Sequence, residues 1–279
     1  QISGLLQAIR HVREGAYSHR ADASGTDEIA QIAAEFNSLT DRLQTTENAR
    51  RRFVSDASHE LKTPLAGIRL LTDSILQTDH MDEETTKEFV SDIGREAERL
   101  SRITENLLRL TRLGSGVVQQ PYPVAVQPVL KRVERMLAMV AQEKGVTLSG
   151  SADEDAVAMA TDDDVHQILY NLMENAIKYS AVENGFVRAQ AHVEGEQVVI
   201  TVSDNGIGIP DEDLPHVFDR FYRVDMMRSR EVGGTGLGLS IVKDTIENRG
   251  GTISAAHNAD GVGTVFTVRL PLAERGEDA

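Results

Sequence analysis

Apolar residues recur at steps of three and four positions over most of the first 113 residues, and this spacing predicts a series of amphipathic helices. Two helical segments lie within residues 1–47 and are joined by a polar connector that contains glycine. Two longer helices follow, one ending near Thr78 and one running from Asp82 to about Leu113. Two antiparallel helices with one apolar face each make half of a four-helix bundle, so we expect two chains to pair.

The pattern changes beyond a stretch rich in glycine and proline at residues 114–125, which we interpret as a linker. Short alternating runs typical of strands then mix with helical segments. Helices are expected from Val129 to Val140, at 162–179 and at 237–248, and strands at 146–148, 157–160, 186–193, 198–203, 252–256 and 264–270. The chain is thus predicted to be multidomain, α followed by α+β, with a sheet that has helices on one face.

One of the predicted helices carries a histidine on its solvent side. Ala57 and Leu61 belong to the apolar face, and His59 lies two residues from each of them. At roughly 100° per residue, His59 is about 200° around the helix from both. Its imidazole is therefore expected to point into solvent.

The neighbours of this histidine favour a functional interpretation. An outward imidazole next to Glu60, with Thr63 one turn further along, suits chemistry performed on the histidine by a group that arrives from outside. A surface histidine without function is the alternative. Pro64 weighs against that alternative, because a proline deep in a helix removes the amide that would bond the Glu60 carbonyl and costs about 3 kcal/mol.

Composition narrows the classes of partner and chemistry. The 279 residues include 44 acidic and 29 basic ones, and a net charge of −15 repels phosphate backbones, so we expect no nucleic acid partner. The absence of cysteine excludes disulfides, thiolate metal sites and a cysteine nucleophile. The chain has no apolar run of 18 residues and is expected to be soluble as given, while its abrupt start at Gln1 indicates that an upstream segment has been cut away.

Asn171 and Asn175 lie four residues apart, on one face of a predicted helix, with Lys178 and Tyr179 one turn on. Neutral oxygen ligands with a cation nearby suit a Mg²⁺ ion that bridges phosphates. Exposed asparagines without a function are the alternative, and are common at this spacing.

Residues 204–210 read DNGIGIP and end a predicted buried strand. A carboxylate held there, that of Asp204, can accept a hydrogen bond from an exocyclic amine, while Gly206 and Gly208 let the backbone approach a flat ring. An ordinary turn is the alternative, because Asp-Asn-Gly is also a good turn sequence.

Residues 233–239 read GGTGLGL and open directly into a helix. Glycines at a helix N-terminus leave amides free to bind phosphate oxygens, helped by the helix dipole. The run is neither a Walker loop nor the dinucleotide fingerprint, because no Lys-Ser/Thr follows and no strand immediately precedes it. Residues 218–231 lack periodicity and are predicted to form a mobile lid over the ligand.

In this order and spacing, these segments resemble the motifs of the sensor histidine kinases of two-component systems. Residues 53–64 resemble the H box of the family, and the polar segments of the second half resemble its N, G1, F and G2 boxes. Residues 1–47 resemble a HAMP linker, with Gly25 and the 36–37 pair at matching places, although Ala30 stands where that family often has glycine.

The resemblance covers nearly the whole chain and implies four parts. Residues 1–47 would be a parallel coiled-coil HAMP-like linker, 48–113 a dimerisation and histidine phosphotransfer hairpin, 114–125 a linker, and 126–279 a catalytic ATP-binding domain, an α/β sandwich of the Bergerat fold. It also implies a homodimer and a response-regulator receiver domain as partners. Contact with a membrane would come only through a segment upstream, which makes this the cytoplasmic portion of a bacterial inner (plasma) membrane protein.

The resemblance also implies roles for the matching residues, with ATP and Mg²⁺ as cofactors. Asn175 would ligate Mg²⁺, Asp204 would read the adenine amine, and Tyr179 would lie against the nucleotide. The nucleotide-binding residues implied in this way are Asn171, Asn175, Lys178, Tyr179, Asp204, Gly206, Gly208, Gly234, Thr235, Gly236, Leu237 and Gly238.

For catalysis, the resemblance implies that His59 attacks the γ-phosphate of ATP while Glu60 orients or deprotonates the other ring nitrogen. Arg223 is the preferred candidate for steadying the γ-phosphate, ahead of Arg220. The phosphoryl group would then pass to an aspartate of the response regulator, and Thr63 would position water to dephosphorylate that regulator.

Two other functions stay open at this point. One is a Bergerat-fold ATPase of the chaperone or gyrase kind, in which His59 has no role. The other is a degenerate kinase that only dimerises and scaffolds a partner. Incubation with γ-labelled ATP separates them, because a kinase acquires acid-labile label, an ATPase releases free phosphate, and a scaffold does neither.

Overall fold

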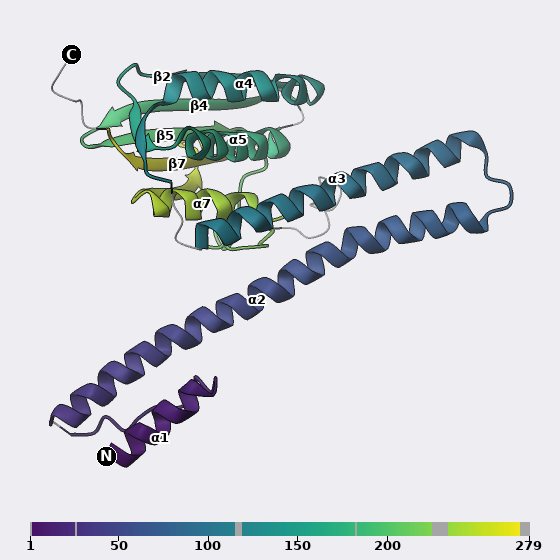
Figure 1. Cartoon of the computed structure of the whole chain (residues 1–279). Coiled ribbons are helices and arrows are strands. Elements are labelled where there is room, and N and C mark those ends of the chain that lie inside the picture. The colour runs from purple at the N-terminus through teal and green to yellow at the C-terminus, as the bar shows by residue number, and fades with distance from the viewer. Residues whose placement is uncertain (1, 26, 115–118, 182, 225–233, 274–279) are drawn as a thin grey trace. The chain divides into compact units, whose positions relative to one another are not determined.

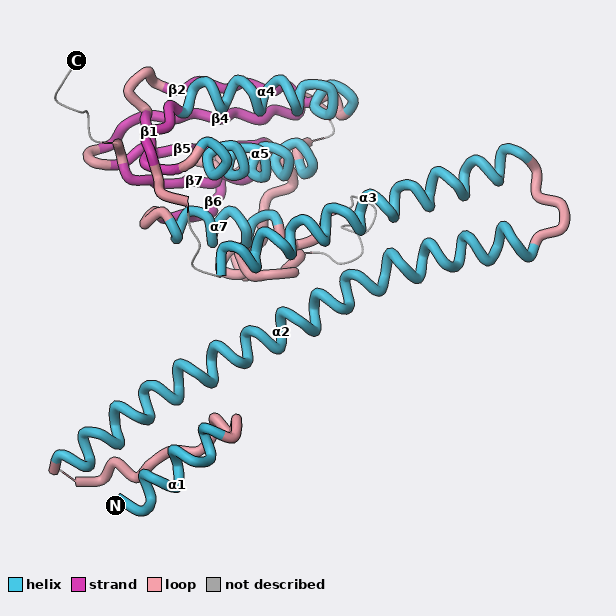
Figure 2. Tube along the Cα trace, viewed as in Figure 1, coloured by secondary structure: helices cyan, strands magenta, loops and turns pink. Residues whose placement is uncertain are grey.

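The computed structural model describes residues 2–25, 27–114, 119–181, 183–224 and 234–273. The chain divides into two units, residues 1–63 and 64–279. Figure 1 labels the elements in chain order, and Figure 2 shows which segments are helix, strand or loop.

The first unit contains α1 (Ile2–Arg13) and the first part of α2 (Glu28–Gln77), joined by a connector. The two predicted helical segments are confirmed, but the second does not end near residue 47, because α2 runs without a break from Glu28 to Gln77 and includes the longer helix that was expected to follow. Its small core is a cluster of alanines from α1, the connector and α2, with partly buried apolar side chains packed against it: Ala8, Ala21 and Ala33, then Leu5, Ala23 and Phe36. Several apolar side chains of these two helices stay exposed in a single chain: Ile2, Leu6, Ile9, Ile32, Leu39 and Leu43. Such a stripe is what a coiled-coil seam exposes when its partner helix comes from a second chain.

Asn37 ties the connector to α2. Its Oδ1 accepts a hydrogen bond from the Ala21 N–H at 2.8 Å, and its Nδ2 donates to the Ala21 carbonyl at 2.9 Å. Ala21 is buried, so the amide side chain satisfies both backbone groups of a residue that water reaches poorly. The asparagine of the 36–37 pair therefore has a structural purpose in this fold.

The second unit begins within α2, which continues as a helix through Pro64. α3 (Glu83–Gly114) follows after a short turn. Asp82 caps its start, because the Asp82 carboxylate accepts hydrogen bonds from the N–H and the hydroxyl of Thr85 at 2.8 and 2.7 Å. The predicted ends of both long helices are confirmed.

The rest of the second unit is built on a five-stranded mixed sheet with strand order β2-β4-β5-β7-β6. Its strands are β2 (Val146–Ala152), β4 (Gly185–Glu194), β5 (Gln197–Asp204), β6 (Thr252–His257) and β7 (Thr264–Pro271). β2 is parallel to β4, and the other neighbours are antiparallel. Three helices cover one face of the sheet (Figures 1 and 2): α4 (Val126–Glu143), α5 (Asp162–Tyr179) and α7 (Gly238–Asn248). The predicted layout of a sheet with helices on one face is confirmed.

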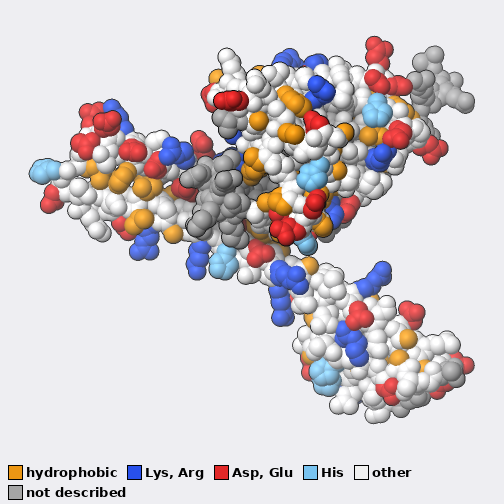
Figure 3. Space-filling view, turned by 180° about the vertical axis from the view of Figure 1, so that it is seen from behind, with side chains coloured by type: hydrophobic (Ala, Val, Ile, Leu, Met, Phe, Trp, Pro, Cys, Tyr) orange, Lys and Arg blue, Asp and Glu red, His pale blue; other side chains and the backbone are white. Residues whose placement is uncertain are grey.

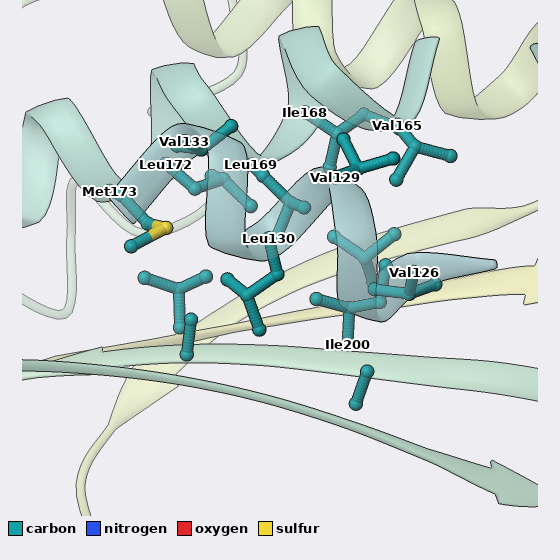
Figure 4. Packing of buried hydrophobic residues seen from close by; sticks show 14 of the residues in the cluster. Val126, Val129, Leu130, Val133, Val165, Ile168, Leu169, Leu172, Met173 and Ile200 are labelled. Atoms are coloured by element: carbon teal, nitrogen blue, oxygen red, sulfur yellow. The ribbon is translucent and has the colours of Figure 1, made fainter. Parts of the chain in front are cut away.

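The core lies between this sheet and its helices, as Figure 4 shows for part of it. Apolar residues of α4 and α5 at helical spacing point down onto the inward-facing positions of the strands. Every second residue of β5 from Val198 to Val202 belongs to this core: Val198, Ile200 and Val202. The labelled helix residues of Figure 4 are Val126, Val129, Leu130, Val133, Val165, Ile168, Leu169, Leu172 and Met173.

One strand departs from the prediction. β1 (Tyr122–Ala125) pairs antiparallel with β3 (Val157–Ala160), although residues 114–125 were expected to be linker throughout. Prolines at 121 and 123 favour irregular structure. A proline is nevertheless tolerated on an edge strand, where its missing N–H costs no ladder hydrogen bond, and this two-stranded sheet consists of edges only.

Candidate functional site

The end of β5 meets the end of α5 at Tyr179. Ile207 N–H donates a hydrogen bond to the Tyr179 carbonyl at 3.1 Å. A Cβ on Gly206 would overlap the same carbonyl oxygen, so no other residue fits there without moving the backbone. Gly208 has φ of +72°, in the left-handed region that favours glycine. Both predicted glycines are thus needed for the path of the chain past α5.

Asp204 is the buried carboxylate of this segment, with 4% of its surface exposed. Its Oδ1 accepts a hydrogen bond from the Gly206 N–H at 2.8 Å, and the Thr264 N–H also donates to the carboxylate. Burial raises the pKa of the Asp204 carboxyl above its ordinary value, although the two N–H donors act to lower it. A buried carboxylate held in this way by backbone amides has lone pairs left to accept from a ligand amine.

A loop that the sequence analysis did not single out closes around Asp204. Asn258 Nδ2 donates to the Asp204 carbonyl at 2.6 Å, and a Cβ on Gly263 would overlap that carbonyl oxygen. Next to it, Asn205 Oδ1 accepts from the Phe186 N–H at 2.8 Å and so ties the motif to β4. The only signal for this loop in the sequence is a pair of glycines, at 261 and 263, just before the last strand.

The glycine-rich segment meets α5 on the other side. A Cβ on Gly234 would lie 2.5 Å from Lys178 Nζ, and one on Gly238 would lie 3.3 Å from Asn171 Oδ1. The ammonium and the amide therefore lie directly against glycine backbone at the start of α7. No side chain of the segment stands between them at these two positions.

The interior of the glycine-rich segment is held by Phe221. Its N–H donates to the Gly236 carbonyl at 2.9 Å, and Gly236 has φ of +68°. Leu237 is fully buried, and its N–H donates to Thr235 Oγ1 at 3.3 Å. Phe221 belongs to the predicted lid, of which the part beyond Val224 lies outside the described residues.

Lys178 and Asn171 supply the charge and the hydrogen-bonding groups that face the glycine-rich segment. Burial lowers the pKa of the Lys178 ammonium to about 8, with Glu174 acting in the opposite direction and Arg223 in the same one. Lys178 Nζ also lies 5.1 Å from the centre of the Tyr179 ring. Asn171 Nδ2 is buried and has no hydrogen-bond partner among the described residues. A ligand with acceptor oxygens would satisfy this amide and pair with the ammonium.

Asn175 lies one turn after Asn171 on the same face of α5 and is half-buried. The described residues contain no cluster of three His, Cys, Asp or Glu side chains that could hold a metal ion. Amide oxygens are neutral ligands of the kind that Mg²⁺ accepts when water and phosphate oxygens supply the rest of its shell. The donor set fits a metal that arrives with a phosphate ligand.

The histidine singled out in the sequence is exposed on α2, as predicted. Glu60 beside it is half-buried. Thr63 Oγ1 donates to the His59 carbonyl at 3.2 Å, so the threonine hydroxyl lies one turn along the same helix. These three residues belong to the first unit, and the pocket around α5 belongs to the second.

Two surface properties complete the description. On the face shown in Figure 3, lysine and arginine side chains are interspersed with aspartate and glutamate and form no continuous basic surface. None of the helices in the described ranges is both long enough and apolar enough to cross a bilayer.

Comparison with known families assigns three consecutive regions. Residues 2–45 match the HAMP domain, residues 49–116 the His Kinase A (phospho-acceptor) domain, and residues 160–274 the histidine kinase-, DNA gyrase B- and HSP90-like ATPase. The sensor histidine kinase YclK of Bacillus subtilis (strain 168) is 32% identical over 284 residues, which cover 99% of this chain and 59% of YclK. The chain spans about half the length of the curated relatives that it matches.

Two solved structures share the fold over most of the chain. Full-length ShkA in complex with AMPPNP has a TM-score of 0.57 and 26% identity, over 80% of this chain and 46% of ShkA. The histidine kinase ThkA in complex with the response regulator protein TrrA has a TM-score of 0.64 and 21% identity, over 83% of this chain and 66% of ThkA. At that identity the second likeness concerns the fold alone.

Proposed function

The chain belongs to the sensor histidine kinases, and on that premise we propose that it transfers the γ-phosphoryl group of ATP to His59 and then to an aspartate of a response regulator. The observation that carries the proposal is the group of side chains gathered at the end of α5. There a buried carboxylate, a desolvated ammonium and an amide without a partner among the described residues lie against glycine backbone. The same chain exposes a histidine on a helix that matches a phospho-acceptor domain.

In this proposal the β5 side of the pocket binds the base. Asp204 accepts a hydrogen bond from the adenine amine, since two backbone amides already hold its carboxylate in place. Gly206 and Gly208 keep side chains out of the space beside it, and Tyr179 lies at the rim, 37% exposed, where its ring can cover the nucleotide.

The glycine-rich side binds the phosphates. Lys178 Nζ pairs with phosphate oxygens, and Asn171 Nδ2 donates its free N–H to another, while amides at the start of α7 face the same charge. Arg223 steadies the γ-phosphate, because its charge acts on both Lys178 and Tyr179 from the lid side. The backbone that borders the triphosphate runs through Gly234, Thr235, Gly236, Leu237 and Gly238.

Mg²⁺ would be held by the Asn175 amide oxygen together with phosphate oxygens and water. When bound, the ion neutralises charge on the phosphates. The residues of the chain supply the orientation: Asn175 on α5 and the backbone at the start of α7 approach the pocket from two sides.

The proposed chemical step forms a bond between one nitrogen of the His59 imidazole and the γ-phosphorus, and breaks the bond from that phosphorus to the β-bridging oxygen, so that ADP leaves. The proton on the other ring nitrogen passes to Glu60, which raises the nucleophilicity of the imidazole. The phosphoryl group then moves from nitrogen to a carboxylate oxygen of the response regulator. Thr63, one turn from His59, would position the water that later hydrolyses this acyl phosphate.

We also propose the partners of the chain and the boundaries of its domains. Two copies would complete a four-helix bundle from α2 and α3, with HAMP-like helices at 1–47 and the phosphotransfer hairpin at 48–113. The response regulator binds near His59, and membrane attachment comes through a segment upstream. The catalytic domain begins at 126, with β1 as an additional strand at its entrance.

Autophosphorylation with γ-labelled ATP and Mg²⁺ tests the proposal on the native chain, His59→Gln and Asn175→Ala. Acid-labile label on the native chain that is lost in both variants is the expected result. Asn175→Ala should also weaken the Mg²⁺ dependence of nucleotide binding, whereas His59→Gln should bind ATP normally.

Other outcomes contradict the proposal in different ways. Label retained in His59→Gln would move the acceptor to another residue. Release of free phosphate without labelled protein would indicate an ATPase, and binding of ATP without either product would indicate a scaffold.

A further inference from the structure

The segment just before β1 is fastened to the start of α5 and the end of α7. Arg249, which follows α7, donates through Nη1 to the Gln119 carbonyl at 2.7 Å and through Nε to Asp164 Oδ2 at 2.7 Å. Tyr122 adds a second attachment, because its hydroxyl oxygen accepts from the Asp162 N–H at 3.0 Å. Three parts of the chain meet at this point, and the first and last of them, at Gln119 and Arg249, are 130 positions apart.

The side chain of the arginine at the centre is buried. The side chains of Arg249 and Asp164 are only 5% and 11% exposed. Asp164 is also fixed by the capping box of α5, in which its Oδ2 accepts from the Thr161 N–H at 3.0 Å. Removing one partner of such a buried pair is costly, so the pair holds the guanidinium in position to donate to the Gln119 carbonyl, a bond that is itself exposed.

A neighbouring ion pair is exposed to solvent. Arg109 of α3 pairs with Asp163 at 2.9 Å, and the Asp163 side chain is 73% exposed. Ion pairs in that setting contribute little to stability. α3 also contacts α7. When α3 separates from α7 and from Asp163, the chain between Gly114 and Gln119 remains as the covalent connection to the ATP-binding domain.

We propose that Arg249, Asp164 and Tyr122 form a clamp on the linker that sets how far the ATP-binding domain can travel from the hairpin that carries His59. This rests on the proposed kinase function. From Gly114 to Gln119 the chain has five residue steps, which span at most about 18 Å. Without the Arg249 bond, the first fixed point becomes Tyr122, and eight steps span at most about 29 Å. Arg249 is thus a positioning residue for the transfer to His59.

The size of the effect follows from tether length. The effective concentration of one tethered domain at the other falls roughly as the −3/2 power of the number of steps. Lengthening the tether from five steps to eight lowers it about twofold. Removing the Tyr122 hydroxyl as well leaves Tyr122 paired with Ala160 at the start of β1, so the first fixed point stays at Tyr122 and the tether stays at eight steps.

Arg249→Lys is the informative variant. A lysine keeps a charge for Asp164 but has one ammonium in place of the arginine fork, so it cannot hold Asp164 and Gln119 in the same way at once. Arg132→Lys is the matched control, because Arg132 pairs with Asp162 at 2.5 Å on the same helix end and touches no linker residue in the described contacts.

The experiment measures the initial rate of autophosphorylation at saturating ATP, the ATP dissociation constant and the melting temperature in the full chain. We expect the rate to fall about twofold in Arg249→Lys, with ATP affinity unchanged, and no change in Arg132→Lys. Adding Tyr122→Phe should cause no further loss, because β1 still holds residue 122. Deleting three residues, 116–118, in the Arg249→Lys background returns the tether to five steps and should restore the rate.

Restoration of the autophosphorylation rate by the deletion distinguishes an effect of tether length from a loss of folding stability. A destabilised domain would lose ATP affinity and would not recover when the linker is shortened. A native rate in Arg249→Lys, an increased rate, or no rescue by the deletion would overturn the clamp, provided that the native chain is labelled. A native chain without label would instead contradict the proposed kinase function.

Discussion

Raising the pH from 7 to 9 is expected to weaken ATP binding through one side chain, Lys178. Its pKa is lowered to about 8, chiefly because the ammonium is buried against the glycine-rich segment. The fraction of protonated Lys178 then falls from about nine tenths to about one tenth between these two pH values. If only the protonated form binds the phosphates, the apparent dissociation constant rises in proportion, by nearly tenfold.

The neighbouring tyrosine does not change its charge in this range. Burial raises the pKa of the Tyr179 hydroxyl, so this ring stays neutral across the window. The change in affinity over this range is therefore assigned to Lys178.

The assay is a titration with a non-hydrolysable ATP analogue at half-unit pH steps, on the native chain, Lys178→Arg and Lys178→Met. Arginine stays charged throughout, so its affinity should not change with pH, and methionine should give a weak affinity that is equally constant. A native profile that is flat, or a fall with pH that also occurs in Lys178→Met, would refute the reasoning.

Folding stability should change with pH in the opposite direction to ATP affinity. The folded-state pKa of Lys178 is below its unfolded value of 10.5, so between about 8 and 10.5 the unfolded chain binds more protons at this site than the folded chain. The contribution of Lys178 to the free energy of unfolding therefore rises with pH over that interval. Urea midpoints of the native chain minus those of Lys178→Met should show the rise.

Three further predictions follow from the geometry. Gly206→Ala places a Cβ against the Tyr179 carbonyl oxygen and should lower the free energy of unfolding by about 1–3 kcal/mol, measured by urea denaturation; a stability equal to the native chain would contradict the tight approach. Asp204→Asn should weaken ATP and ADP binding by the same factor, about tenfold or more, because the lost contact is to the base; calorimetry that finds only ATP affected would place Asp204 at the phosphates instead. Asn37→Ala removes both hydrogen bonds to Ala21 and should speed amide exchange of the connector, while exchange in α5 serves as the internal control.

Local chemistry made much of the fold predictable. The prediction of a helix at 162–179 matches α5 because its start is encoded by a local capping box, Thr161 with Asp164, and its length by apolar spacing. The exposure of His59 was predictable for a similar reason, since the phase of one helix decides it.

Other features depend on partners that no local pattern contains. β1 was missed because its strand character comes from pairing with β3, more than thirty residues away, while its own prolines favour a loop. The loop at Asn258 could not be predicted for the same reason. Asn258 donates a hydrogen bond to the Asp204 carbonyl, and the two residues are 54 positions apart.

The helical periods and the exposure of His59 can be read from the sequence, because each is set by spacing within a few turns. The tertiary structure adds that Lys178 is desolvated against Gly234, that Asn171 Nδ2 has no hydrogen-bond partner among the described residues, and that Arg249 reaches Gln119. Burial and distance between remote segments set those properties, and neither is a function of local spacing.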